Sequence, residues 1–339
     1  TGYSGNDGNS PRFGIVSDKL VLATDNKYYP TLNTTNTDYV KEEESLKYLF
    51  DSNDIANAKT AYTNLTGLFY MENGYYVYDS AEHFAQLNGT NLDVYEAAGR
   101  GTPKFAPFNQ QGATGSFNYH FGMTAEFDFM MPANGQINSK DMIFEFTGDD
   151  DVWVFIDETL VLDIGGIHGQ SSGSINFNTG EVLIYSGNTT YRTLNLWEIL
   201  GTYKWDDYTI HSFNFYYLER GQNESNCKLK FNLPSVPARS VTVGKTLSYN
   251  ENAPAEEIQE YLANQEYSFR VMKKEDNNLM IAANTPYEIW TQEPLERIGS
   301  GVTDDNGIFK VKPGQLAIFS DAFEADDEIS YYVQELVPI

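Results

Sequence analysis

The chain has 339 residues, of which 48 are acidic and 22 basic, so its formal net charge is −26. Nucleic acid and anionic membrane surfaces bind clustered Lys and Arg, and no such cluster occurs, so both classes of partner are excluded. The single cysteine, Cys227, excludes an intrachain disulfide and a multi-cysteine zinc site. The acidity is compatible with cation binding or with solubility alone.

Short alternating runs rich in aromatic and β-branched residues favour sheets over helices, so we expect a mainly β fold. The length suits two β-sandwich domains, the larger one lectin-like, with a short helix near the N-terminus. The segment Pro234-Ser235-Val236-Pro237 predicts a linker. The expected domains are therefore residues 1–234, which open with an irregular arm over 1–40, and residues 238–339.

In chain order, residues 41–65 contain the best helical pattern, because Leu46, Leu49 and Phe50 have the spacing of one helical face, although Ile55 lies off it. Strands follow, and the first pair turns at Asn73-Gly74. The expected strands of the first domain are 69–78, 125–129, 142–146, 152–156, 213–218 and 228–233. In strand 152–156 both faces are apolar, which predicts a strand between two layers.

The second domain is expected to be a smaller sandwich, because turn signals recur every 10 to 20 positions. Residues 255–264 fit a short helix within it. The expected strands are 241–245, 267–272, 287–290, 308–311, 316–319 and 329–335.

Three consecutive aspartates, Asp149 to Asp151, lie between two apolar strands. Carboxylates at the edge of a core need compensation, and Ca²⁺, which prefers six to eight oxygen ligands, would supply it. Two adjacent aspartates can chelate one ion only where the backbone bends, for example at a cis peptide bond. The alternative is a solvated turn between strands.

The run from Met142 to Asp157, which contains Gly148-Asp149-Asp150-Asp151-Val152-Trp153-Val154, and the following run from Leu160 to Gly169 resemble the fibro-slime domain. That domain is similar to the protective-antigen-type β-sandwich of yeast flocculins and bacterial adhesins. Further matching stretches are 74–80, 119–123, 215–221 and Ser225-Asn226, so the resemblance covers about residues 68–234.

This resemblance implies that Asp149 and Asp150, joined by a cis peptide, hold a calcium ion that also contacts sugar hydroxyls. It places further ligands in a later loop, where Glu219 and Asn226 are the candidates. Asp151 stands where related lectins often have Gly, so it adds a charge and is a candidate further ligand.

Trp197 and Trp205 are candidate platforms for a sugar ring, with core or rim packing as the alternative. His168, in the turn Gly165–Gly169, is either a ligand contact or a turn residue bonded to backbone. The other histidines have no metal-ligand spacing, and no nucleophile elbow, phosphate loop or dinucleotide motif occurs. Asp149 and Asp157 lie too far apart along one strand for a glycosidase pair, so no enzyme is expected.

Parts of the second domain resemble Gram-positive pilin domains and the B-type stalk domains of collagen adhesins. In those, a first-strand Lys forms an isopeptide bond to an Asn, promoted by an acid, and Lys245 and Glu335 match the lysine and the acid. The alternative for Lys245 is an ordinary surface lysine.

We therefore expect a non-enzymatic, calcium-dependent adhesin on the surface of a Gram-positive bacterium that binds carbohydrate or glycoprotein through its first domain. In this view the second domain is a pilin-like stalk, and further tandem domains would follow. The alternative is a structural pilin or matrix component in which calcium only stabilises a loop.

Overall fold

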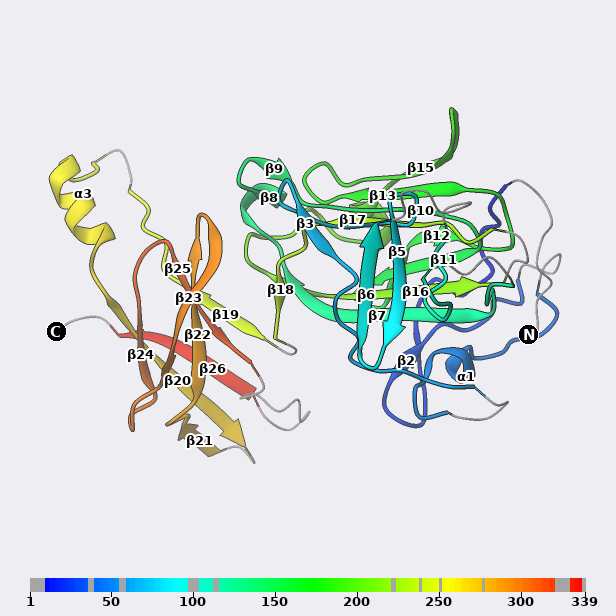
Figure 1. Cartoon of the computed structure of the whole chain (residues 1–339). Helices are drawn as coiled ribbons and strands as arrows, with labels where there is room; N and C mark the ends of the chain where they lie inside the picture. The colour runs from blue at the N-terminus through cyan, green and yellow to red at the C-terminus, as the bar shows by residue number, and fades with distance from the viewer. Residues whose placement is uncertain are drawn as a thin grey trace. The chain divides into compact units, whose positions relative to one another are not determined.

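The computed structural model describes residues 10–35, 40–54, 59–96, 104–111, 116–220, 224–237, 240–249, 252–275, 278–320 and 330–336 (Figure 1). Strands dominate, and the prediction of a mainly β chain with two β-sandwiches and few helices is confirmed. No helix among the described residues is long and apolar enough to cross a membrane.

The first sandwich consists of two antiparallel sheets that lie face to face (Figure 1). The seven-stranded sheet has the order β15 (Thr189–Asn195), β14 (Glu181–Ser186), β13 (Ser171–Asn176), β10 (Ile143–Gly148), β17 (Cys227–Phe231), β4 (Tyr75–Asp79) and β3 (Tyr70–Glu72). The five-stranded sheet has the order β12 (Thr159–Ile164), β11 (Asp151–Ile156), β16 (Ile210–Glu219), β7 (Phe121–Met130) and β18 (Ser235–Val236).

Shorter elements complete this part of the chain. They are β1 (Val21–Leu22) with β2 (Tyr28–Tyr29), the hairpin β5 (His83–Asn88) and β6 (Asn91–Glu96), the turn η2 (Ala133–Gly135), the pair β8 (Gln136–Ile137) and β9 (Lys140–Asp141), and the helices α1 (Lys47–Phe50) and α2 (Leu196–Leu200).

The second sandwich has two sheets of four strands. One has the order β19 (Val241–Gly244), β25 (Gln315–Phe319), β22 (Pro286–Gln292) and β23 (Leu295–Val302). In the other, β20 (Tyr267–Glu275) pairs with β21 (Asn278–Ile281), β24 (Ile308–Val311) and β26 (Ser330–Leu336). The helix α3 (Glu256–Ala263) confirms the short helix expected at 255–264.

The chain divides into two compact units, and it passes between them more than once. The first unit comprises residues 1–126, 141–205 and 212–233, and the second comprises 127–140, 206–211 and 234–339. The second unit therefore includes two short segments from within the expected first domain.

Strand β11 lies between two apolar layers, as its sequence predicts, and all six of its residues are buried. Alternation along the strand sends Val154 toward the seven-stranded sheet, on the same face as its cross-strand partner Phe215, whose ring meets those of Phe144 and Phe146. Trp153 and Phe155 point the other way and pack against the N-terminal arm.

The arm is irregular and packs against the first unit, as expected. Its apolar residues Ile15, Val16 and Leu32 are fully buried beside Trp153. Arg12 exchanges two backbone hydrogen bonds with Gly165 at the end of β12. The arm thus forms a third layer over the five-stranded sheet.

The helix expected over 41–65 is wrong except for the single turn α1. The backbone becomes extended at Asp51, whose side chain accepts the N–H of Asn53 and so competes with helical hydrogen bonding. The ammonium group of Lys59 then donates to the carbonyls of Tyr48 and Asp51. The expected part around Ile55 lies outside the described residues.

Replacing Phe155 by Ala should lower the free energy of unfolding by about 3–5 kcal/mol, because a fully buried ring is lost between two packed layers. The matched control is Tyr203→Ala, since that side chain is 93% exposed. Urea unfolding of both variants measures the effect, and equal midpoints would contradict this account of the core.

Asp163 of β12 anchors the arm, because its Oδ2 accepts the N–H of Gly14 at 2.6 Å. Burial raises the pKa of Asp163 from 3.8 to about 7, although the Gly14 N–H and the charge of Arg192 act in the opposite direction. The protonated form therefore fits the folded state better. The contribution of protonated Asp163 to the free energy of unfolding is fully present below about pH 4, and it is lost as the pH rises through about 7.

The variant Asp163→Asn cannot ionise, so it should gain stability relative to the natural protein between pH 4 and pH 8. The expected gain is on the order of a few kcal/mol. Thermal melting across this range measures it, with exposed Asp305→Asn as the control. A difference in melting temperature that does not change with pH would refute the buried titration.

Candidate functional site

Three chain crossovers between the two sheets lie side by side at one end of the first sandwich. They join β10 to β11, β16 to β17, and β12 to β13. In the seven-stranded sheet β10 lies between β13 and β17, and in the five-stranded sheet β11 lies between β12 and β16. Because the strands that lead into them are neighbours, all three loops lie at the same end of the sandwich. The acidic triplet lies on the β10–β11 loop, between the other two.

The triplet turns sharply because Asp150 adopts a left-handed backbone conformation, with φ of 64°. The expected cis peptide bond between Asp149 and Asp150 is wrong, since the cis bond in the described residues is Glu293–Pro294. Asp and Asn adopt the left-handed conformation more readily than most residues. The bend that the sequence required is thus made by a backbone dihedral and not by a cis bond.

Each aspartate bonds one crossover to another. Asp149 Oδ1 accepts the N–H of Asn226, and Asp150 Oδ2 accepts the N–H of Arg220 at 2.6 Å. Asp151 Oδ1 accepts the N–H of Gly166 at 2.6 Å. These bonds use one oxygen of each carboxylate, and they fix the relative positions of the three loops.

Arg220 provides the cation of the cluster. Its Nε lies 2.6 Å from Asp151 Oδ2, and the Asp151 side chain is 0% exposed. This ion pair neutralises one of the buried carboxylates, because paired buried charges are far less costly than isolated ones. The sequence analysis did not single out Arg220 as a partner, although it directly follows the candidate Glu219.

Glu219, the candidate ligand of the later loop, is the fourth buried carboxylate and lies close to Asp150. Its Oε2 accepts the hydroxyl of Tyr217 at 2.9 Å. Burial, and next the charge of Asp150, raise the pKa of Glu219 to about 8. Burial likewise raises the pKa of Asp149 to about 6 and that of Asp150 above its usual value.

The donor set fits calcium in kind, because it consists of hard oxygen atoms in a place where negative charge is poorly solvated. Within the part of the chain that the structure describes, no three acidic, His or Cys side chains are grouped to hold a metal. An ion would therefore combine carboxylates such as those of Asp150 and Glu219 with carbonyl and amide oxygens. The loop that ends at Asn226 would supply these, and its residues 221–223 lie outside the described residues.

His168 lies on the third crossover and is buried. Its Nδ1 lies 2.7 Å from the carbonyl oxygen of Gly169, so Nδ1 carries the proton and donates. This is the backbone-bonded turn histidine of the sequence analysis. The other ring nitrogen, Nε2, is buried without a hydrogen-bond partner among the described residues.

Trp197 and Trp205 pack as a hydrophobic rim and are not near the acidic cluster. Trp197 lies against the backbone of Gly180 and meets Trp205 edge-on at 5.3 Å. Gly180 lies just beyond Asn176, the last residue of β13. Asn176 pairs with Ile143, which is at the end of β10 farthest from the triplet. Five residues of strand, roughly 17 Å, separate the two places, so these rings do not lie beside the cluster.

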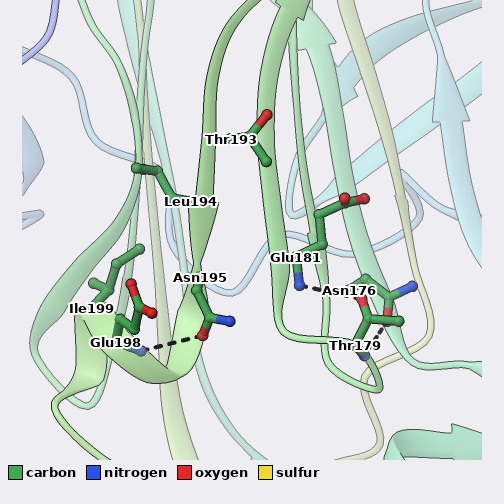
Figure 2. A pocket seen from close by; sticks show the side chains of 8 residues that line it. All are labelled: Asn176, Thr179, Glu181, Thr193, Leu194, Asn195, Glu198 and Ile199. Carbon is green, nitrogen blue, oxygen red and sulfur yellow. Dashed lines mark hydrogen bonds between the residues drawn. The ribbon is translucent and has the colours of Figure 1, made fainter.

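A hollow of about 600 Å³ lies beside this rim, between the β13–β14 turn and the start of α2 (Figure 2). Its polar groups serve local structure. Asn195 Oδ1 accepts the N–H groups of Trp197 and Glu198 and so caps α2. Asn176 Oδ1 accepts the N–H of Thr179 in the turn.

In the second unit Lys245 and Glu335, the candidate isopeptide lysine and acid, lie together. The Lys245 Nζ lies 2.7 Å from Glu335 Oε1 and also lies 4.8 Å from the centre of the Tyr267 ring. The pair is an ion pair between β26 and the residue that follows β19.

Three relatives come from the amoeba Dictyostelium discoideum. Protein psiF is 31% identical over 236 residues, which are 66% of this chain and 29% of psiF. Protein psiP is 30% identical over 195 residues, covering 55% of this chain and 22% of psiP. Protein psiH is 26% identical over 242 residues, covering 67% of this chain and 28% of psiH.

The chain therefore spans less than a third of the length of these relatives. No family model and no solved structure matches it. The assignment to the fibro-slime and bacterial pilin or collagen-adhesin domains is wrong, because the relatives are amoebal psi proteins. The short acidic and aromatic stretches on which it rested therefore did not identify the relatives.

Replacing Arg220 by Met should lower the free energy of unfolding by about 3–5 kcal/mol, because Asp151 would be left buried without its cation. Lys228→Met is the matched control, since it breaks a more exposed pair with Asp79 that contributes about 0–1 kcal/mol. Urea unfolding in a chelator compares them. Equal losses would show that the Arg220 pair is not the main neutralising contact.

Proposed function

We propose that the first unit is a non-enzymatic, calcium-dependent binding domain for carbohydrate or glycoprotein that acts outside the cell. The observation that carries the proposal is the burial of Asp149, Asp150, Asp151 and Glu219 around a single paired cation, Arg220. Bound calcium would supply the missing positive charge and polarise oxygen ligands. The chain's own part is to hold the carboxylates close together by backbone hydrogen bonds before an ion arrives.

The position of the cluster supports ligand binding, because loops at the end of a rigid sandwich are common binding surfaces. A calcium ion held there with open coordination positions binds neighbouring hydroxyl oxygens in place of water. Sugars provide such pairs of neutral oxygens. Weak single sites of this kind gain strength when several copies act together.

A structural role is the second candidate, and a specific observation favours it. The three aspartates already bond the crossovers to one another through Asn226, Arg220 and Gly166. In that case a bound ion would stabilise the loops without reaching a ligand. Calcium binding without any glycan binding would distinguish this role from the first.

Calcium should bind the natural protein with saturation and raise its melting temperature. The stabilisation should reach about 2.7 kcal/mol when calcium is a hundredfold above its Kd. Asp150→Asn, which keeps the shape of the side chain but not its charge, should lose most of this effect. Calorimetry and thermal melting measure both quantities.

The control is Asp305→Asn, because that aspartate is exposed in a turn of the second unit. It should respond to calcium as the natural protein does. Identical melts with and without calcium for the natural protein would refute the calcium site. If calcium does bind, calcium-dependent binding of the protein to a glycan array would distinguish the lectin role from the structural role.

A further inference from the structure

The outer face of the seven-stranded sheet is polar, in contrast to its inner face. Alternation along β10 buries Phe144 and Phe146 against the other sheet and turns Glu145 and Thr147 outward. Along β17 it likewise buries Leu229 and turns its lysines outward. The outward side chains belong to neither the core nor the acidic cluster.

These outward side chains form two rows across neighbouring strands, because cross-strand partners lie on the same face. The first row, in strand order, is Asp79, Lys228, Thr147, Ser172 and Tyr185. The second row is Lys230, Glu145, Ser174 and Leu183. In the first row, Lys228 and Tyr185 stand on either side of the hydroxyl side chains of Thr147 and Ser172.

A hollow of about 450 Å³ lies on this face. Lys228 and Tyr185 form two of its walls, Thr147 lines it between them, and Gln170 and Asn226 line it from the neighbouring crossovers. The Thr147 hydroxyl lies 2.9 Å from the hydroxyl of Ser172. The volume lies within the range of small-molecule sites and suits one or two sugar rings.

The charges of the hollow cancel in pairs, which sets the class of ligand. Lys228 pairs with Asp79 at 2.8 Å, and Lys230 pairs with Glu145 at 3.1 Å. In a chain with a net charge of −26, this face is locally neutral but rich in donors and acceptors. Such a lining hydrogen-bonds hydroxyl groups and offers an ion no unbalanced charge.

Tyr185 adds an apolar surface to this polar hollow. The residue is 37% exposed, and its position on β14 places it beside Ser172 in the row of hydroxyls. A tyrosine combines the apolar contact area of its ring with a polar hydroxyl group at the end of the side chain. The hollow thus offers a flat apolar surface for ring C–H groups and polar groups for hydroxyls.

We propose that this hollow, the sheet-face groove, binds a neutral oligosaccharide and does so without calcium. The sugar ring lies on Tyr185, and its hydroxyls bond to Thr147, Gln170 and the paired side chains of Lys228 and Asp79. The proposal shares the ligand class of the proposed function but depends on none of Asp149, Asp150, Asp151 and Glu219. The hollow beside α2 is a weaker candidate, because its polar groups are already used in the cap and turn.

The test is an array of neutral gluco-, manno- and galacto-oligosaccharides, probed with the whole chain in excess chelator and again in calcium. At least one neutral oligosaccharide should bind in chelator at ligand concentrations of about 1 mM. Tyr185→Ala should weaken that binding by about tenfold, and Tyr185→Phe should keep it, because the ring face remains. Thr147→Val should also weaken it by removing one hydroxyl without changing the volume.

Tyr203→Ala is the control, because that exposed tyrosine lies outside the groove, and it should bind like the natural protein. Thermal melting shows that each variant is folded. Absence of binding in chelator, or unchanged binding by both Tyr185→Ala and Thr147→Val, would overturn the groove. Binding that needs calcium and is lost only in Asp150→Asn would overturn the groove and support the calcium site.

Discussion

The compensation of buried negative charge is the constraint on which the loop end of the first sandwich depends. Asp149, Asp150 and Asp151 leave the solvent because the chain passes between the sheets there, and ionised carboxylates lose much of their hydration on burial. Backbone N–H groups from two neighbouring crossovers and the guanidinium group of Arg220 compensate these negative charges. The same contacts fix the loops, so charge compensation and loop positioning are one feature of the fold.

The strand that follows the triplet connects this end to the rest of the unit. Strand β11 is covered on one face by the seven-stranded sheet and on the other by the N-terminal arm. Asp163, across from Trp153 on β12, ties the arm down by accepting the N–H of Gly14. A residue that titrates near neutral pH therefore contacts the layer that shields one face of β11.

The sandwich presents two chemically different surfaces. At the loop end, carboxylates exceed the cations available, which favours a divalent cation. On the outer sheet face, Lys228 and Lys230 are matched by Asp79 and Glu145, which favours a neutral polar ligand. The relatives in Dictyostelium are more than three times the length of the matched part.

The sequence by itself determined the mainly β fold and the layering of β11, because alternation and apolar content are local properties of the chain. It also identified Asp149 to Asp151 as charges that need compensation. It did not predict β13, since a strand of Ser, Gly and Asn has no hydrophobic pattern and forms only between its neighbours. Tertiary structure alone decided that Arg220 neutralises Asp151, that Trp197 lies at the far end of the sheet, and that Tyr185 lines a hollow with Thr147. Those contacts join residues distant in sequence, and strand order and register, which no local pattern encodes, bring them together.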